Sequence, residues 1–375
     1  MLGTTPLPFN FLLEPNAEQI EVFLLNGTEK MPVEKTSLRD SIFELAFPSY
    51  SNRIVAELNG NHMQGHLLIE RPAKDPVKYA FSAVHGQSYR YFSDKSNDHV
   101  DITGTWRLEL DYTGSGNVQT YIGQLQQDGD QLTANFASPR GDFRFLAGQV
   151  RSNQFWLSIF DGGLTQAWSG NLLPDGTLTG TTSNGMMNNS PWRAERMEFP
   201  ESCGFPSYEV VDSKLVLAPF NLPSCHGGTI SFPNPNHQGK AIALIMAASW
   251  CPTCHDIAGF IQPLINANKA RGLTAIYCMF EFSAEWPLVE NQVLAFLRRY
   301  NIDSEAVFAG HCEIAQRNTV FPDLPDITAF PTVFLLDKKH QLRFVLPSFC
   351  GPATGELHRQ SKRLFTDCVE AVLAE

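Results

Sequence analysis

Two cysteines separated by two residues, Cys251 and Cys254, carry the strongest chemical signal in this sequence. An unbroken apolar run over 241–248 precedes them, and apolar residues every three or four positions follow over 257–265. This pattern predicts a buried strand that ends just before the pair and a helix that begins at it. The free N–H groups of the first helical turn would stabilise a thiolate at Cys251. A thiolate with a second sulfur three residues later can attack a disulfide and then be released, so we predict a redox-active Cys251–Cys254 disulfide.

The same residues also fit the motif for covalent haem attachment, because His255 directly follows Cys254. The context argues against haem. A buried strand is expected before the pair, the cysteines are expected to open a helix, and Phe330-Pro331-Thr332 follows later in the chain. We therefore expect no organic cofactor.

Zinc and peroxidase chemistry are two further alternatives. A zinc site would need more ligands beside the pair, drawn from Cys225, His226 or His255, and these residues show no regular spacing. A peroxidatic cysteine would need a Thr or Ser three residues earlier, where Ala248 stands. We expect neither a metal site nor peroxidase activity.

Composition narrows the classes of partner. The chain has 375 residues, 43 % of them hydrophobic, and a net charge of −11 without a cluster of Lys and Arg. Nucleic-acid binding needs a basic surface and is disfavoured. No apolar run reaches the roughly 18 residues of a membrane helix. Residues 1–10 lack the basic flank and apolar core of a signal peptide, so a membrane link would require a signal or lipid anchor that has been removed.

The distribution of cysteines indicates a domain boundary. None of the eight lies before Cys203. We predict a β-rich domain over 1–100, an antiparallel β meander or up-and-down barrel over 101–202, and an α/β thioredoxin-like domain over 203–375. The second domain shows strand-like alternation at Trp106, Leu108, Leu110 and Tyr112, and further strand-like runs recur roughly every 10 residues between turn signals.

The predicted barrel offers an alternative function. Four of its residues could line a ligand site, namely Trp106, Trp156, Trp168 and Trp192. Aromatic side chains in a small barrel more often just fill it. Binding of a ligand or a client protein by this barrel is therefore the second hypothesis.

The C-terminal part predicts the element order β, β, α, β, α, β, β, α from residue 228 onward. With a Cys-x-x-Cys at the junction of strand and helix, this is the order of a thioredoxin fold. Pro331 stands immediately before a predicted strand and is a candidate cis-proline. Its loop would then lie against the cysteines and present a backbone edge to an extended substrate.

These residues resemble the thioredoxin-like disulfide reductases of the TlpA and ResA type. The matching segments are Ala218-Pro-Phe, Gly239-Lys, Trp250-Cys-Pro-Thr-Cys and Phe330-Pro-Thr-Val-Phe-Leu-Leu-Asp. A subgroup with a β-rich N-terminal extension is similar also at Phe280-Glu and at Gly351-Pro-Ala-Thr-Gly, and more loosely at Phe81-Ser-Ala-Val-His-Gly and Ile102-Thr-Gly-Thr-Trp. One departure is Gly259, where the family usually has a proline; Pro263 comes a turn later.

The resemblance implies a role for each matching residue. Cys251 would be the exposed attacking thiolate and Cys254 the buried resolving thiol. Pro331 would be the cis-proline. Glu281 would be a buried acid near the pair that takes the proton from Cys254. Neighbouring residues would support the site or bind substrate, namely Trp250, Pro252, Thr253, Phe330 and Thr332.

The other six cysteines suggest structural roles. Cys278 in an apolar strand and Cys368 on an apolar helix face are expected to be buried thiols. Cys203, Cys225, Cys312 and Cys350 lie near element ends, where one structural disulfide is plausible; its pairing stays open.

The sequence therefore predicts a thiol–disulfide oxidoreductase that reduces protein disulfides outside the cytoplasm, in the periplasm or an equivalent compartment. Its electrons would come from a partner protein. The direction of electron flow stays open, because Cys-x-x-Cys proteins span roughly −270 to −120 mV.

Overall fold

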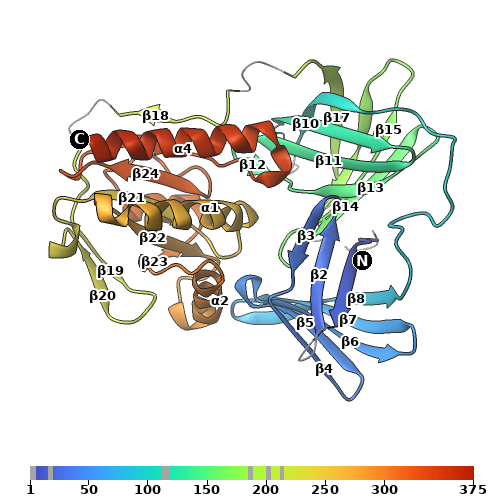
Figure 1. Cartoon of the computed structure of the whole chain (residues 1–375), viewed down its shortest axis with the longest axis horizontal. Coiled ribbons are helices and arrows are strands. Elements are labelled where there is room, and N and C mark those ends of the chain that lie inside the picture. The colour runs from blue at the N-terminus through green and yellow to red at the C-terminus, as the bar shows by residue number, and fades with distance from the viewer. Residues whose placement is uncertain are drawn as a thin grey trace. The chain divides into compact units, whose positions relative to one another are not determined.

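The computed structural model describes residues 6–15, 20–111, 116, 118–184, 189–199, 204–211 and 215–375, so Tyr112 and Cys203 lie outside it. The chain divides into two compact units (Figure 1). The first comprises residues 1–138 and 142–203, and the second comprises 204–375 together with 139–141. The first unit therefore includes both of the segments that we expected to form separate β domains.

The first hundred residues form two antiparallel sheets that share one apolar core. The smaller sheet contains β1 (Asn10–Pro15), β2 (Ile20–Asn26) and β3 (Glu29–Pro32). The larger sheet contains β4 (Lys35–Arg39), β5 (Ile42–Phe47), β6 (Asn52–Asn59), β7 (His62–Arg71) and β8 (Lys74–Val84). Buried and less buried positions alternate along β5, as expected for strands with one face on a core.

The antiparallel meander expected after residue 100 is present and closes on itself. Its strands are β9 (Gly104–Leu110), β10 (Gln119–Asp128), β11 (Gln131–Ser138), β12 (Gly141–Asp142), β13 (Leu146–Arg151), β14 (Gln154–Phe160), β15 (Thr165–Leu172), β16 (Leu178–Ser183) and β17 (Ser190–Met197). Each long strand pairs with the next in the chain, and β17 pairs with β9. The result is an up-and-down barrel.

Aromatic side chains fill this barrel. Phe136 stacks on Trp168 at 4.7 Å between ring centroids, and Trp192 lies 6.0 Å from Trp168. Glycine makes room for them, because a Cβ on Gly170 would lie 2.7 Å from the Trp192 ring. Trp106 is also part of this core.

Trp156, one of the four tryptophans that the ligand-binding hypothesis placed in the barrel, does not belong to the barrel core. Its neighbours Phe155 and Leu157 point into the core, so the alternation of a strand turns Trp156 to the other face. There it contacts Tyr91 and Phe92, with ring centroids 6.5 and 5.0 Å away. The interior is therefore a packed core, which weakens the hypothesis of a ligand-binding barrel.

The second unit is built on a six-stranded mixed sheet in the order β18-β25-β24-β21-β22-β23. Its strands are β18 (Glu209–Val210), β21 (Ala241–Ala247), β22 (Leu273–Glu281), β23 (Glu305–His311), β24 (Thr332–Leu336) and β25 (Leu342–Leu346). Strands β21, β22 and β23 are parallel to one another, and β24 and β25 are antiparallel to their neighbours. A separate hairpin of β19 (Phe220–Pro223) and β20 (Thr229–Phe232) precedes the sheet.

Four α-helices complete this unit: α1 (Pro252–Asn268), α2 (Trp286–Arg299), α3 (Ile314–Val320) and α4 (Glu356–Ala374). Figure 1 shows α1 and α4 side by side on one face of the sheet, and Phe260 and Phe365 join them with ring centroids 6.2 Å apart. Short 3-10 turns cover Pro48–Tyr50, Pro235–His237, Lys269–Arg271 and Pro352–Thr354. Within the described ranges, no helix is long and apolar enough to cross a membrane.

The elements predicted for this unit are present, and further elements accompany them. The expected order of elements did not include strands β18, β19 and β23 or helix α3. α3 has only seven residues, too few for a helical repeat of apolar positions to stand out. Pro263 lies inside α1, one turn after the glycine that replaces the proline expected from the resemblance.

Candidate active site

The cysteine pair lies at the junction that the sequence predicts. All seven residues of β21 are buried, as expected for a central strand covered on both faces. Cys251 is the N-cap of α1, and Pro252 occupies the first turn, where its missing N–H costs nothing. The backbone N–H of Cys254 donates to the Cys251 sulfur at 3.3 Å. One of the free N–H groups of the helix therefore points at the sulfur that we expect to attack.

Both cysteines are free thiols in this structure, and both are buried. Cys251, expected to be exposed, is only 6 % exposed, so that expectation was wrong. Its sulfur lies between the Cys254 N–H and the carbonyl oxygen of Phe330, to which the thiol donates at 3.5 Å. Cys254 is fully buried, as expected of the resolving thiol. Burial, and then the neighbouring Cys251, raise the pKa of the Cys254 thiol well above its ordinary value.

Glu281 ends β22 and is buried with only 1 % of its surface exposed. Both of its carboxyl oxygens accept hydrogen bonds from Ser249, one from the backbone N–H at 2.9 Å and one from the hydroxyl at 2.8 Å. Burial raises the pKa of Glu281 to about 8, and the two Ser249 bonds act in the opposite direction. A carboxyl group that titrates near neutral pH can exchange a proton during a reaction.

The negative charge of Glu281 helps to raise the pKa of three nearby thiols. It contributes to the raised pKa of Cys254, and after burial it is the next cause that raises the pKa of Cys225 to about 12 and that of Cys312 to about 11. Cys312 lies directly beside it, since the Cys312 N–H donates to the Glu281 carbonyl at 2.9 Å. No sequence pattern placed Cys225 and Cys312 beside Glu281, because they come from segments far apart in the chain.

The Phe330–Pro331 peptide bond is cis, the conformation expected at this position. Two further cis bonds precede Pro206 and Pro233, which the sequence did not suggest. Phe330 supplies the carbonyl next to the Cys251 sulfur, and its ring stacks on Phe280 with centroids 5.4 Å apart. The Pro331 loop and the cysteine pair are thus brought together.

The residues expected to support the site lie in different settings. Trp250 donates from Nε1 to the carbonyl of Phe280 at 3.2 Å and stacks on the exposed ring of Phe282, with centroids 4.4 Å apart. Thr332 is buried in β24, and its hydroxyl donates to the carbonyl of Ala329 at 2.8 Å. Thr253 is buried in the first turn of α1, while Pro252 is half-buried. In this structure Thr332 shapes the Pro331 loop from within, and Phe282 is an aromatic surface residue that the sequence analysis missed.

His255 is held by two hydrogen bonds that the sequence did not reveal. Its Nε2 lies 2.8 Å from the carbonyl oxygen of Ser249, and its Nδ1 lies 2.9 Å from the hydroxyl of Tyr300. Both nitrogens of the haem-like motif are therefore occupied within the protein. The adjacency of His255 to the pair was the only sequence signal, and Tyr300 carried none.

The other described cysteines are free thiols as well. Cys278 and Cys368 are buried, as predicted. Cys225, Cys312 and Cys350 form no disulfide, so the structural disulfide considered for them is not present among the described residues. In the same described ranges, no three His, Cys, Asp or Glu side chains are grouped so that they could hold a metal ion.

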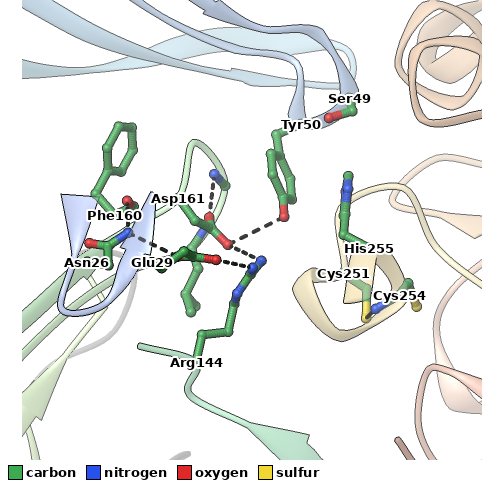
Figure 2. A network of polar contacts seen from close by, with 12 residues as sticks. Asn26, Glu29, Ser49, Tyr50, Arg144, Phe160, Asp161, Cys251, Cys254 and His255 are labelled. Carbon is green, nitrogen blue, oxygen red and sulfur yellow. Dashed lines mark hydrogen bonds and ion pairs between the residues drawn. The ribbon is translucent and has the colours of Figure 1, made fainter. Parts of the chain in front are cut away.

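The first unit has a buried polar network of its own. Arg144 donates to Glu29 at 2.8 Å and to Asp161 at 2.9 Å, so one guanidinium joins two carboxylates (Figure 2). Asp161 also accepts the N–H groups of Gly163 at 2.9 Å and Leu164 at 2.5 Å. This network ties the β3 strand to the barrel.

Comparisons with known proteins add solved structures only. No protein-family model and no curated protein matches the sequence. Similar solved structures include a protein assigned as the thiol:disulfide interchange protein DsbE of Chlorobium tepidum, with 20 % identity over 44 % of this chain and 99 % of that chain and a TM-score of 0.34. A secreted thiol-disulfide isomerase of Corynebacterium glutamicum has 16 % identity over 48 % of this chain and 98 % of its own, with a TM-score of 0.33. A DsbF homologue of Corynebacterium diphtheriae has 14 % identity over 42 % and 94 %, with a TM-score of 0.32.

These neighbours are disulfide oxidoreductases by their descriptions, and each covers less than half of this chain. Identities and scores this low do not assign an activity. The chemical argument for this protein therefore rests on its own residues.

Proposed function

We propose that this protein is a thioredoxin-like thiol–disulfide oxidoreductase that reduces protein disulfides through the Cys251–Cys254 dithiol. The observation that carries this proposal is the position of Cys251, which is the N-cap of α1 and receives the Cys254 N–H on its sulfur. The N-terminus of a helix is in general a favourable place for an anion, and the second sulfur lies three residues later on the same helix, within reach of a mixed disulfide.

In the first step, the Cys251 thiolate attacks one sulfur of a substrate disulfide. An S–S bond forms between Cys251 and that sulfur, the substrate S–S bond breaks, and the other substrate sulfur leaves as a thiolate that takes a proton from water. In the second step, Cys254 loses its proton to Glu281 and attacks Cys251. The Cys251–Cys254 disulfide forms, the bond between Cys251 and the substrate breaks, and the second substrate sulfur leaves as a thiolate that takes a proton from water. The substrate gains two electrons. A dithiol donor protein later supplies two electrons to this protein and reduces its Cys251–Cys254 disulfide again.

Glu281 suits the role of proton acceptor because its environment differs from that of an ordinary carboxylate. The raised pKa of about 8 brings it closer to the raised pKa of the Cys254 thiol, so that proton transfer costs less. The TlpA and ResA subtype, an extracytoplasmic location and a separate electron donor belong to this proposal. They are supported by the sequence segments that resemble that family.

The test is reduction of insulin by dithiothreitol in the presence of the protein. The wild type should accelerate the reaction, and Cys251→Ser should lower the rate to that of dithiothreitol alone. Cys254→Ser should accumulate a mixed disulfide between Cys251 and the substrate, visible by mass spectrometry. Equal rates with wild type and Cys251→Ser would contradict the proposal. A redox potential as high as that of strong oxidants, about −120 mV, would turn it into an oxidase.

A further inference from the structure

His255 has a bonding pattern that fixes where its proton lies. A carbonyl oxygen can only accept, so Nε2, which lies 2.8 Å from the carbonyl of Ser249, must carry a proton. In the neutral ring Nδ1 is then an acceptor, and the Tyr300 hydroxyl at 2.9 Å donates to it. The ring also packs edge-on against Phe296, with centroids 4.9 Å apart. His255 is buried, and the two hydrogen bonds together with the contact to Phe296 hold its ring in place.

Ser249 is the residue that His255 holds in place. Its carbonyl accepts from His255, while its N–H and its hydroxyl both donate to Glu281, at 2.9 and 2.8 Å. Ser249 is fully buried and lies between the last residues of β21 and Trp250. The carbonyl, the N–H and the hydroxyl are all attached to the Cα region of one residue, so the bond from His255 to the carbonyl helps to fix the backbone from which both donors reach Glu281.

We propose that His255 and Tyr300 are positioning residues, which hold Ser249 so that both of its donors reach the carboxyl group of Glu281. The inference rests on the proposed function, because it assigns how the proton acceptor of that reaction is tuned. Neither residue touches the reacting sulfurs through a recorded bond. They act through Ser249 on the readiness of Glu281 to take a proton.

The two hydrogen bonds from Ser249 matter because the rest of the surroundings of Glu281 disfavour its charged form. Cys254 from α1, Cys225 from the segment between β19 and β20, and Cys312 from the end of β23 all share its electrostatic environment, and each has a raised pKa. Burial is the main cause that opposes the charged carboxylate, and the bonds from Ser249 are the ones that favour it. Loss of a donor should therefore raise the pKa of Glu281 further.

The experiment compares Tyr300→Phe with Tyr277→Phe. Each change removes one hydroxyl that bonds to a side chain of α1. The hydroxyl of Tyr277 donates to Gln262 at 3.1 Å, and Gln262 makes no hydrogen bond in the described structure that leads to Glu281. The first measurement is the pH dependence of single-turnover reduction of a peptide disulfide. The second is infrared titration of the protonated carboxyl band of Glu281, identified by its loss in Glu281→Gln.

We expect Tyr300→Phe to move both midpoints upward by about half a pH unit to one pH unit, and Tyr277→Phe to leave them in place. His255→Ala should shift them at least as far. His255→Gln should recover part of the shift, because its amide can again donate to the Ser249 carbonyl. Midpoints of Tyr300→Phe and His255→Ala that overlay the wild type would overturn the proposal, as would an equal shift in Tyr277→Phe.

The two readouts separate this inference from the proposed function. The infrared titration needs no turnover, so a shift there supports the positioning role even if insulin is not reduced. Conversely, normal reduction that depends on Cys251 together with an unshifted carboxyl band would overturn the positioning role alone. His255→Gln and Tyr300→Phe give independent tests if His255→Ala fails to fold.

Discussion

The two units bury carboxyl groups in opposite ways. In the first unit, Glu29 and Asp161 share the guanidinium of Arg144, and Asp161 accepts two backbone N–H groups as well. In the second unit, Glu281 has two hydrogen bonds from Ser249, and no ion pair with a described Lys, Arg or His is recorded for it. One site thus supplies a counter-charge, and the other supplies only dipoles.

The difference separates a structural site from the site that we propose to be reactive. A buried carboxylate with a guanidinium partner can stay ionised, and its charge then serves to join segments of the fold. Burial raises the pKa of Glu29 too, but Arg144 is the next influence and acts against it. Glu281 lacks such a partner, and its pKa rises to about 8. Only the uncompensated carboxyl group is therefore suited to exchange a proton near neutral pH.

Removal of the counter-charge should have the largest effect on stability. Arg144→Met keeps the length of the side chain but leaves Glu29 and Asp161 buried without a cation. We expect a loss of about 3–5 kcal/mol in the free energy of unfolding, measured by urea unfolding followed by circular dichroism. Arg193→Met is the control, since Arg193 is exposed and its carboxylate partners lie 3.9 Å away. Equal unfolding midpoints for both variants would show that the shared guanidinium does not hold the first unit together.

The raised pKa of Glu281 should make the free energy of unfolding depend on pH. The folded-state pKa of Glu281, about 8, lies above its ordinary value of 4.5, so the native state binds the proton more tightly than the unfolded state. Its contribution is complete below the ordinary value and is lost as the pH rises toward 8, with a slope of up to about 1.4 kcal/mol per pH unit. Glu281→Gln cannot titrate and should remove this slope. Urea unfolding at several pH values between these limits measures it, and an unchanged slope in the variant would assign the titration to another group.

A smaller effect should follow from the buried amide of Asn26 in the first unit, which also accepts from Arg90 at 3.1 Å and donates to Glu29 at 3.4 Å. The Asn26 amide is buried and donates to the carbonyl of Phe160 at 2.9 Å, whereas the exposed Asn153 amide makes the same kind of bond to Leu172 at 3.2 Å. Asn26→Ala leaves a buried carbonyl without this donor and should cost about 1–3 kcal/mol, while Asn153→Ala should cost less than about 1 kcal/mol. Similar losses in urea unfolding for the two variants would mean that burial does not set the cost here.

Local patterns allowed most elements around the cysteine pair to be predicted. The apolar run before Cys251 and the helical spacing after Cys254 are encoded in adjacent residues, so both β21 and α1 followed from them. The barrel strands were likewise visible in the alternation that begins at Trp106. Trp156 was misassigned because four tryptophans were grouped by residue type, although the alternation of β14 places it on the face opposite Phe155.

The functional partners of the pair were only partly visible. Glu281 was singled out through a family resemblance, and its role as proton acceptor stays a prediction. Ser249 and Tyr300 carried no signal, because their bonds to Glu281 and His255 join the segment after β21, the end of β22, α1 and the C-cap of α2. The exposure expected for Cys251 was wrong for the same kind of reason, since the carbonyl of Phe330 comes from a distant loop.

The sequence by itself determined where a thiol pair meets the start of a helix, since that depends on a few consecutive residues and their hydrophobic period. Only the tertiary structure decided which groups surround the pair and which buried carboxylates are neutralised. Glu29 and Asp161 have an arginine between them, and Glu281 has a serine held by a histidine and a tyrosine. Burial and charge pairing, which set the behaviour of these acids, depend on segments that the chain brings together only when it folds.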